Sequence, residues 1–319
     1  MSVKLIRAGM LDSVQDMGRT GYQHIGINPG GAMDRYSAQL ANLMVGNELN
    51  APVIELHFPA GVFTFDAAAL IALAGADFSP SVNGQTVPGN QPLVVNKDSS
   101  LAFREKRRGA RCYLAIKNIE VPRWLGSSST NLKIAAALKH DDIVAVRDAT
   151  DYSGFLNGAA WSALSWRTEP EIVSDDSIRI LQGNEFEWLN ERSRECLTAG
   201  IFRISNSADR MGYQLEGEKL ELTTGSELVS TGVSFGTVQF LPSGTLTILM
   251  ADHQSTGGYP RLGHVISADL PKLAQMQPGD QLKFSFTDLV TAEQLIRQQQ
   301  QHLLQLKNAC KLRLAAVFG

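Results

Sequence analysis

A loop of mixed polar residues between Ala251 and Asp269, ADHQSTGGYPRLGHVISAD, carries the densest chemistry of the chain. It joins two apolar runs, TLTILM and HVIS, that are typical of strands. A simple hairpin tip favours a short Asn-Gly turn rather than a long run of mixed polar residues. We therefore interpret the loop as one wall of a site. It offers an acid, an amide, two hydroxyls and a cation, which are Asp252, Gln254, Thr256, Tyr259 and Arg261.

Three other glycine-bearing stretches hold polar residues that suit a binding site: SVQDMGRTGYQHIGINPGGAMD, GSSSTNLK and SNSADRMGYQLEG. Serine hydroxyls donate hydrogen bonds to carboxylates or amides, and an arginine offers a planar fork for a carboxylate. Backbone N–H groups at the start of a helix also receive anions. The residues singled out in these stretches are Asp16, Arg19, Asp34, Ser128, Asp209 and Arg210.

Structural roles compete with these interpretations. Asp34 opens a predicted helix, where a carboxylate commonly satisfies the free N–H groups. Asp209 and Arg210 alternatively pair with each other to hold a turn. The basic run Arg104–Arg111, REKRRGAR, is interpreted as a solvated turn between strands rather than a patch for an anion or a partner.

Several chemistries are not supported by the motifs. The glycines form neither GxGxxG nor a Walker loop, and no GxSxG surrounds the serines. His253 and His264 are eleven residues apart without a third ligand nearby, so no metal site is expected. The net charge of -3 does not favour nucleic acid. We expect the four stretches to line a cleft for a small polar, anionic molecule without a metal.

The elements around these loops predict a mainly β protein with a few helices. Asn83-Gly84 is a strong hairpin signal. Apolar residues at helical spacing predict a helix over residues 32–47, stopped at Gly46. A second helix is expected over residues 292–317, opened by a capping box of Thr291 and Gln294. The predicted strands include Val53–Phe58, Val62–Phe65, Leu70–Gly75, Leu101–Arg104 and Cys112–Lys117.

The uneven composition between the two β-rich halves predicts a boundary near Glu169–Asp175. We expect an N-terminal β-rich lobe over 1–168, a C-terminal β-barrel lobe over 169–290 and a helical tail over 291–319. Three scattered cysteines suit a reducing compartment. Neither a signal peptide nor an apolar run long enough to cross a bilayer is present, so a cytoplasmic location without membrane contact is expected.

The four stretches in this order resemble the allophanate hydrolase subunit 2 family, whose members include KipA proteins, the 5-oxoprolinase subunit PxpC and a carboxyltransferase segment of urea carboxylase. The resemblance extends from about Lys4 to Phe286. The stretch IAAALKHDDIVAV departs from the family's usual glycine-rich GGxxGRxLxxGD pattern. The resemblance implies two cyclophilin-like barrel lobes. It also implies an assembly with a KipI-like (PxpB) subunit and a LamB/YcsF-like (PxpA) subunit that opens the lactam of 5-oxo-L-proline to L-glutamate and hydrolyses ATP.

Roles for the candidate residues follow from that implied reaction. The substrate carboxylate calls for a cation, either Arg210 or Arg261. Asp252 or Asp209 is expected to move a proton. The remaining candidates are expected to orient or bind the substrate: Gln254, Thr256, Tyr259, Asp16, Arg19, Asp34 and Ser128. The motifs do not indicate which subunit binds ATP.

Two other functions are compatible with the resemblance. One is the carboxyltransferase component of a biotin-dependent urea or amide carboxylase. Such a component would receive carboxybiotin from elsewhere, because this chain contains no Met-Lys-Met biotinyl motif. The other is a non-catalytic regulatory protein that binds a KipI-like kinase inhibitor.

Overall fold

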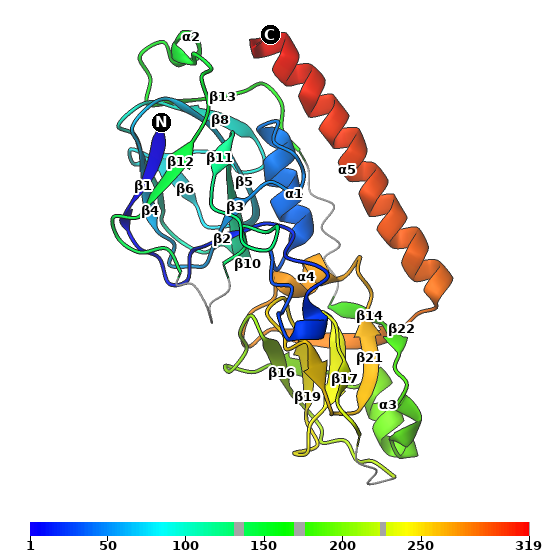
Figure 1. The fold of residues 1–319 in the computed structure, drawn as a ribbon. Coiled ribbons are helices and arrows are strands. Elements are labelled where there is room, and N and C mark those ends of the chain that lie inside the picture. Colours follow the sequence, from blue (N-terminus) through cyan, green and yellow to red (C-terminus); the bar gives the residue numbers. More distant parts are fainter. Residues whose placement is uncertain (131–136, 169–175, 224–227, 319) are drawn as a thin grey trace. The chain divides into compact units, whose positions relative to one another are not determined.

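The computed structural model forms two compact units (Figure 1). The structure describes residues 1–130, 137–168, 176–223 and 228–318. Unit 1 consists of residues 1–18, 34–171 and 301–319, and unit 2 consists of residues 19–33 and 172–300. The boundary predicted near Glu169–Asp175 falls outside the described residues.

Unit 1 is built from two antiparallel sheets whose apolar faces contribute to a common core. The first sheet has the order β11 (Ile119–Glu120), β12 (Ile143–Val146), β1 (Ser2–Arg7), β4 (Val62–Phe65), β9 (Ser100–Phe103), β6 (Pro80–Val82) and β7 (Gln85–Thr86). The second has the order β13 (Trp161–Ala163), β8 (Pro92–Val95), β5 (Ala69–Asp77), β10 (Arg108–Ile116), β3 (Val53–Leu56) and β2 (Ser13–Gln15). Alternating side chains such as Phe63 and Phe65 point into this core, as the period of a strand requires.

Helix α1 (Arg35–Met44) packs on β10 and β5 of the second sheet. Asp34 caps its first turn, and Gly46 follows its end with a φ of 74°, so the predicted left-handed stop is confirmed. A short helix α2 (Ser153–Leu156) precedes β13. The predicted hairpin at Asn83-Gly84 is also confirmed, because both residues have positive φ values between the paired strands β6 and β7.

Unit 2 is a closed barrel with an apolar interior. Its strands follow the order β14 (Ser177–Gln182), β21 (Arg261–Val265), β18 (Thr237–Phe240), β19 (Leu246–Leu249), β16 (Gly212–Glu216), β15 (Phe202–Ile204) and β22 (Gln281–Phe286). A separate two-stranded ribbon is formed by β17 (Thr231–Gly232) and β20 (Thr256–Gly257). The short helical elements of this unit are η1 (Gln23–Ile25), η2 (Phe186–Trp188), α3 (Glu191–Ala199) and α4 (Leu270–Ala274).

The C-terminal helix α5 (Leu289–Phe318) begins earlier than predicted. The predicted capping box is wrong: Asp288 accepts hydrogen bonds from the backbone N–H and the hydroxyl of Thr291, at 2.7 and 3.0 Å. Asp288 sits one residue before the helix and therefore takes the capping role. In unit 1, the later part of α5 contacts the unit through residues such as Leu314 and Phe318.

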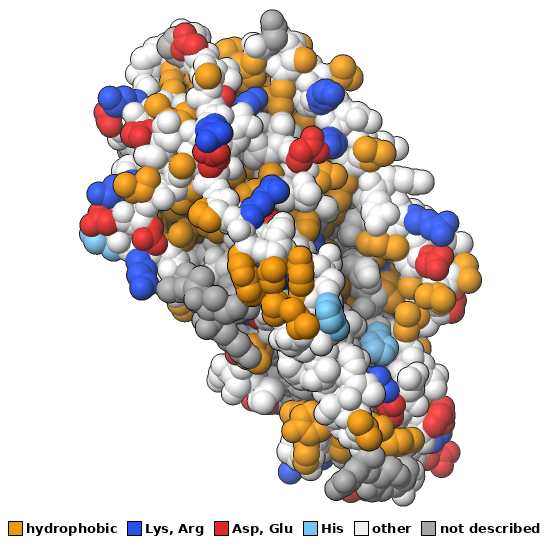
Figure 2. Space-filling model, in the orientation of Figure 1, with side chains coloured by type: hydrophobic (Ala, Val, Ile, Leu, Met, Phe, Trp, Pro, Cys, Tyr) orange, Lys and Arg blue, Asp and Glu red, His pale blue; other side chains and the backbone are white. Residues whose placement is uncertain are grey.

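The predicted fold class is confirmed: the chain is mainly β with a few helices, a closed barrel and a C-terminal helix. Acidic and basic side chains are interspersed on the face drawn in Figure 2, in agreement with the small net charge. The basic run 104–111 lies between β9 and β10 and enters β10. Its Arg104 donates to the carbonyl of Gly84, and Arg107 pairs with Glu105 at 2.6 Å.

Candidate functional site

The candidate residues fall in both units. Unit 1 contains Asp16, Asp34 and Ser128. Unit 2 contains Arg19, Asp209, Arg210, Asp252, Gln254, Thr256, Tyr259 and Arg261.

In unit 1, the carboxylate of Asp16 organises the serine loop. It accepts the hydroxyls of Ser127 and Ser129, each at 2.6 Å, the backbone N–H of Ser128 at 2.7 Å and that of Gly18 at 2.8 Å. Burial alone would raise the pKa of Asp16, but these hydrogen bonds lower it below its ordinary value. The structure therefore brings Asp16 and Ser128 together, with Asp16 as an ionised anchor for the loop.

Asp34 has the helix-capping role that competed with ligand binding. Its carboxylate accepts the backbone N–H of Ser37 at 2.8 Å and the Ser37 hydroxyl at 2.6 Å. Its own N–H donates to the hydroxyl of Tyr113 at 2.7 Å, and Tyr113 donates to Glu55 at 2.9 Å. Asp34 thus ties the start of α1 to the second sheet.

Sequence reasoning missed the buried polar group around Glu55. Glu55 and Tyr113 are fully buried, and the side chains of Arg111 and His57 each lie 3.9 Å from Glu55 Oε1. Burial, and then the neighbouring Glu55, raise the pKa of Tyr113 well above its ordinary value. The available signal was a glutamate in the otherwise apolar strand VIEL.

In unit 2, Arg210 and Asp252 form a buried bidentate ion pair. Arg210 Nε donates to Asp252 Oδ2 at 2.8 Å, and Nη2 donates to Asp252 Oδ1 at 3.1 Å. Nη2 also donates to the carbonyl of Gly31 at 2.7 Å, while the backbone N–H of Asp252 donates to Arg210 O at 2.8 Å. The side chains are only 3% and 8% exposed. This pair fixes the start of the loop that follows β19.

The alternative pairing of Asp209 with Arg210 is not formed. Asp209 is exposed, and its carboxylate accepts the backbone N–H groups of Met211 and Gly212 at 2.7 and 3.0 Å. Arg210 turns to Asp252 because β16 and β19 are neighbours and bring the two residues to the same end of the barrel. Arg19 is buried, and its backbone N–H donates to Pro29 O at 2.8 Å.

A second bidentate pair, between Arg261 and Glu185, fixes the other end of the loop. Arg261 Nε and Nη2 donate to Glu185 at 2.9 and 2.7 Å, and Nη1 donates to the hydroxyl of Thr231 at 3.0 Å. The hydrogen bonds between the two side chains raise the pKa of Arg261 and lower that of Glu185. Glu185 was not identified from the sequence, because its stretch LQGNEFEW carries no motif.

Between the two ion pairs the loop presents polar groups in different settings. Gln254 is half-buried, whereas Thr256 and Tyr259 are exposed. His253 is buried, with Nδ1 2.6 Å from the carbonyl of Gln254. Burial, and then the charge of Arg261, lower the pKa of the half-buried His264. The two ion pairs therefore hold the two ends of one polar loop in unit 2, here called the framed loop (residues 252–261).

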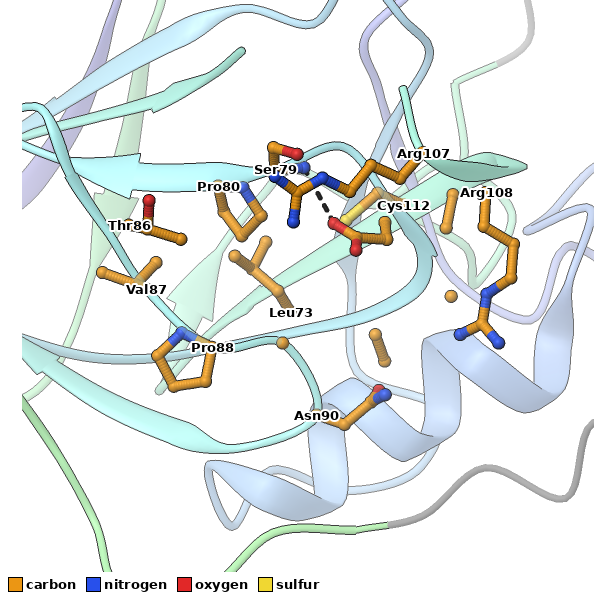
Figure 3. A pocket seen from close by; sticks show the side chains of 15 residues that line it. Leu73, Ser79, Pro80, Thr86, Val87, Pro88, Asn90, Arg107, Arg108 and Cys112 are labelled. Carbon is orange, nitrogen blue, oxygen red and sulfur yellow. Dashed lines mark hydrogen bonds between the residues drawn. The ribbon is translucent and has the colours of Figure 1, made fainter. Parts of the chain in front are cut away.

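Unit 1 also contains a cavity of about 330 Å³ that none of the candidate residues lines. Figure 3 shows it between β5, the loop around Pro88 and the start of β10, with Arg107 and Arg108 beside it. Its labelled residues are Leu73, Ser79, Pro80, Thr86, Val87, Pro88, Asn90, Arg107, Arg108 and Cys112. The cavity is separate from the serine loop that Asp16 organises.

Two kinds of feature are absent from the described parts of the chain. No group of three or more His, Cys, Asp or Glu side chains there is placed to hold a metal ion. No helix there is both long and apolar enough to cross a membrane.

Comparison with known proteins places these features in a family. The model described as carboxyltransferase domain, subdomain A and B, matches residues 25–286. The chain is 33% identical to the C subunit of 5-oxoprolinase from Escherichia coli over 315 residues, which is 95% of this chain and 97% of that protein. It is 30% identical to the corresponding protein of Haemophilus influenzae, covering 92% of this chain and 94% of that one.

Urea-metabolising proteins are also similar, over a small part of their length. The chain is 31% identical to urea amidolyase of Lachancea kluyveri, covering 90% of this chain but 17% of that protein. The crystal structure of Kluyveromyces lactis urea amidolyase matches with a TM-score of 0.85 and 26% identity, over 96% of this chain and 20% of that one. Together with the family model, these matches establish that the chain belongs to the carboxyltransferase domain family, in the part described as subdomains A and B.

Proposed function

We propose that this chain is the C subunit of an ATP-dependent 5-oxoprolinase, which opens the lactam of 5-oxo-L-proline to L-glutamate. The correspondence with the E. coli protein over 95% of one chain and 97% of the other carries this proposal. The urea amidolyases correspond to this chain over only a small part of their length. The oxoprolinase relatives are therefore the better guide to the activity.

The chemistry of the framed loop is compatible with such a substrate. A lactam is stabilised by resonance, so its opening requires activation of the carbonyl and stabilisation of developing charge. Gln254, Thr256 and Tyr259 supply hydrogen-bonding groups that would orient the substrate. Arg261 would bind the substrate carboxylate, and Asp209 or Asp252 would move a proton.

Arg210 is given a structural role rather than a substrate-binding one, because its guanidinium already donates hydrogen bonds to Asp252 and to the carbonyl of Gly31. We propose that it positions the framed loop. In unit 1, Asp16 would position Ser128 through the serine loop. Arg19 and Asp34 would support their segments, Asp34 as the cap of α1.

The proposed reaction is that of an assembly in the cytoplasm. A KipI-like (PxpB) subunit and a LamB/YcsF-like (PxpA) subunit would be its partners, and ATP would be consumed by the complex. We assign no ATP site to this chain.

Reconstitution tests the proposal. The chain is combined with purified KipI-like and LamB/YcsF-like subunits, ATP and 5-oxoproline, and glutamate and ADP are measured. Glutamate is expected only when all three proteins are present, and Arg261→Ala is expected to lower its formation. Binding of the subunits without turnover in any combination would instead favour a regulatory protein that sequesters a KipI-like inhibitor.

A second candidate function is the carboxyltransferase component of a biotin-dependent urea or amide carboxylase. The TM-score of 0.85 with urea amidolyase over 96% of this chain favours it. Carboxybiotin would then be delivered by another protein. Avidin would abolish that activity but leave glutamate formation from 5-oxoproline unchanged.

A further inference from the structure

The side chain of Gln239, on β18 of unit 2, is buried without using its hydrogen-bonding capacity. The residue is only 1% exposed, and neither Oε1 nor Nε2 has a hydrogen-bond partner among the described residues. A carboxamide carries two donor hydrogens and an acceptor oxygen. Leaving both ends buried and unpaired destabilises a fold, and such groups therefore call for an explanation.

Gln239 belongs to a polar row on the outside of the barrel. Val238 and Phe240 point into the apolar interior, so Gln239 points outward. The backbone register pairs Gln239 with Thr247 of β19 on one side and with Arg261 of β21 on the other. Residues paired across neighbouring strands carry their side chains close together on one face. The orphan carboxamide thus lies beside the arginine that ends the framed loop.

The ribbon of β17 and β20 lies against Gln239 and Arg261 of this row. A Cβ added to Gly257 of β20 would lie 2.6 Å from Gln239 Nε2, so the glycine lets the ribbon backbone approach the carboxamide closely. Thr231 of β17 accepts the hydrogen bond from Arg261 Nη1. The ladder of the ribbon consists of the pairs Thr231–Gly257 and Gly232–Thr256. Displacing this short ribbon would uncover Gln239 and release Arg261 Nη1 in the same movement.

We propose that Gln239 is a substrate-binding residue that pairs with an amide whose N–H and C=O lie on the same side, once the ribbon has moved. A lactam ring holds its N–H and C=O in this arrangement. The Gln239 carbonyl would accept the lactam N–H, and its NH₂ would donate to the lactam carbonyl, as a glutamine pairs with the edge of adenine. Arg261 Nη1 would then bind the carboxylate of 5-oxoproline.

The identity of the lactam in this inference rests on the proposed function. The pairing of Gln239 with an amide group does not depend on that function. Urea presents the same N–H and C=O arrangement but has no carboxylate. Both candidate substrates would therefore hydrogen-bond to Gln239, but only 5-oxoproline would also bind Arg261.

The test uses the reconstituted complex with Gln239→Met, which keeps the length of the side chain and removes its polar atoms. Gln214→Met is the matched control, because Gln214 is an exposed glutamine on β16 whose register partner is Thr247 in the same row. Gln239→Met is expected to lower kcat/KM for 5-oxoproline by about 10- to 100-fold, the value of two hydrogen bonds. The same variant is expected to raise the melting temperature, because position 239 then no longer buries an unpaired polar atom. The control changes neither quantity.

A substrate analogue gives a readout that a purely structural role would not move. The lactone in which ring oxygen replaces the N–H of 5-oxoproline is compared with 5-oxoproline by calorimetric titration of the complex. Wild-type protein should prefer the lactam, and Gln239→Met should lose that preference. An unchanged preference, or a loss of activity accompanied by a lower melting temperature, would overturn the assignment of Gln239.

Failure of the inference and failure of the proposed function have different signatures. Wild-type turnover of 5-oxoproline with an equally active Gln239→Met variant refutes the inference and leaves the function intact. If the wild-type complex forms no glutamate, titrations with urea and 5-oxoproline still decide the inference. Binding of either amide that depends on Gln239 supports it, and absence of Gln239-dependent binding refutes it.

Discussion

Replacing Asp252 with alanine is expected to destabilise unit 2 strongly, because it leaves the guanidinium of Arg210 buried without its carboxylate. Arg210 is 3% exposed and would retain the carbonyl of Gly31 as an acceptor. Removing one partner of a buried ion pair costs about 3–5 kcal/mol, because the remaining charge is desolvated without compensation. Asp252→Ala should therefore lose about this much unfolding free energy.

The double variant Arg210→Met/Asp252→Leu separates the pair from the packing around it. Replacing both charges by apolar groups of similar size is often nearly neutral. The double variant should therefore regain most of the stability that Asp252→Ala loses. Native-state hydrogen exchange at the amides of β19 measures the opening free energy of the barrel itself.

A loss below about 1 kcal/mol in Asp252→Ala would refute this reasoning, because it falls outside the range for a broken buried pair. A double variant less stable than the single one would also refute it. Turnover of the same variants in the reconstituted complex distinguishes two roles of Asp252. A positioning role predicts that activity recovers with stability in the double variant, whereas proton transfer by Asp252 predicts that it does not.

Three further predictions concern unit 1. Burial raises the pKa of Asp12 to about 6, so its contribution to stability is present below pH 3.8 and lost as the pH rises through about 6. In urea unfolding between pH 3 and pH 7, the unfolding free energy of the wild-type protein should fall by about 3 kcal/mol relative to that of Asp12→Asn. Parallel profiles of unfolding free energy against pH for the two proteins would contradict this. Asp16→Ala should accelerate hydrogen exchange across the serine loop by about 10- to 100-fold, whereas Ser128→Ala, which leaves the hydrogen bonds to Asp16 in place, should not. Gly46→Ala should cost about 1–2 kcal/mol in thermal unfolding, because φ is 74° there and a Cβ would lie 2.8 Å from Leu314 Cδ1. An unchanged melting temperature would show that this backbone relaxes.

Local signals predicted much of the fold, because they act within a few residues. The Asn83-Gly84 hairpin and the stop at Gly46 depend on backbone conformations that these residue types adopt readily. The start of α5 was misplaced, because Thr291 and Asp288 both have side chains that cap helices. In the structure, the hydrogen bonds identify Asp288 as the capping residue. The sequence pattern alone does not show which of the two residues caps the helix.

The polar loops were predictable as segments, whereas their internal pairing was not. Arg210 and Asp252 are 42 residues apart, and Glu185 and Arg261 are 76 residues apart. Such pairs depend on the order of strands in the barrel, which residue spacing along the chain does not reveal. Gln239 was missed for a related reason: a glutamine in a short strand looks like an ordinary outward-facing residue until the ribbon is placed over it.

Under the proposed pairing with Gln239, an amide group rather than charge alone would determine what binds at the framed loop. Arg210 and Arg261 each have a bidentate carboxylate partner, so neither presents an uncompensated positive charge that would attract any small anion. A carboxylate competes for Arg261 only at Nη1, whose present acceptor is the neutral hydroxyl of Thr231. The ribbon that supplies this hydroxyl also covers Gln239, so a ligand gains both groups only by displacing it. In the proposed site, a simple carboxylate would hydrogen-bond only to Arg261, whereas a lactam acid would hydrogen-bond to both Arg261 and Gln239. The proposal therefore predicts tighter binding of a lactam acid than of a simple anion.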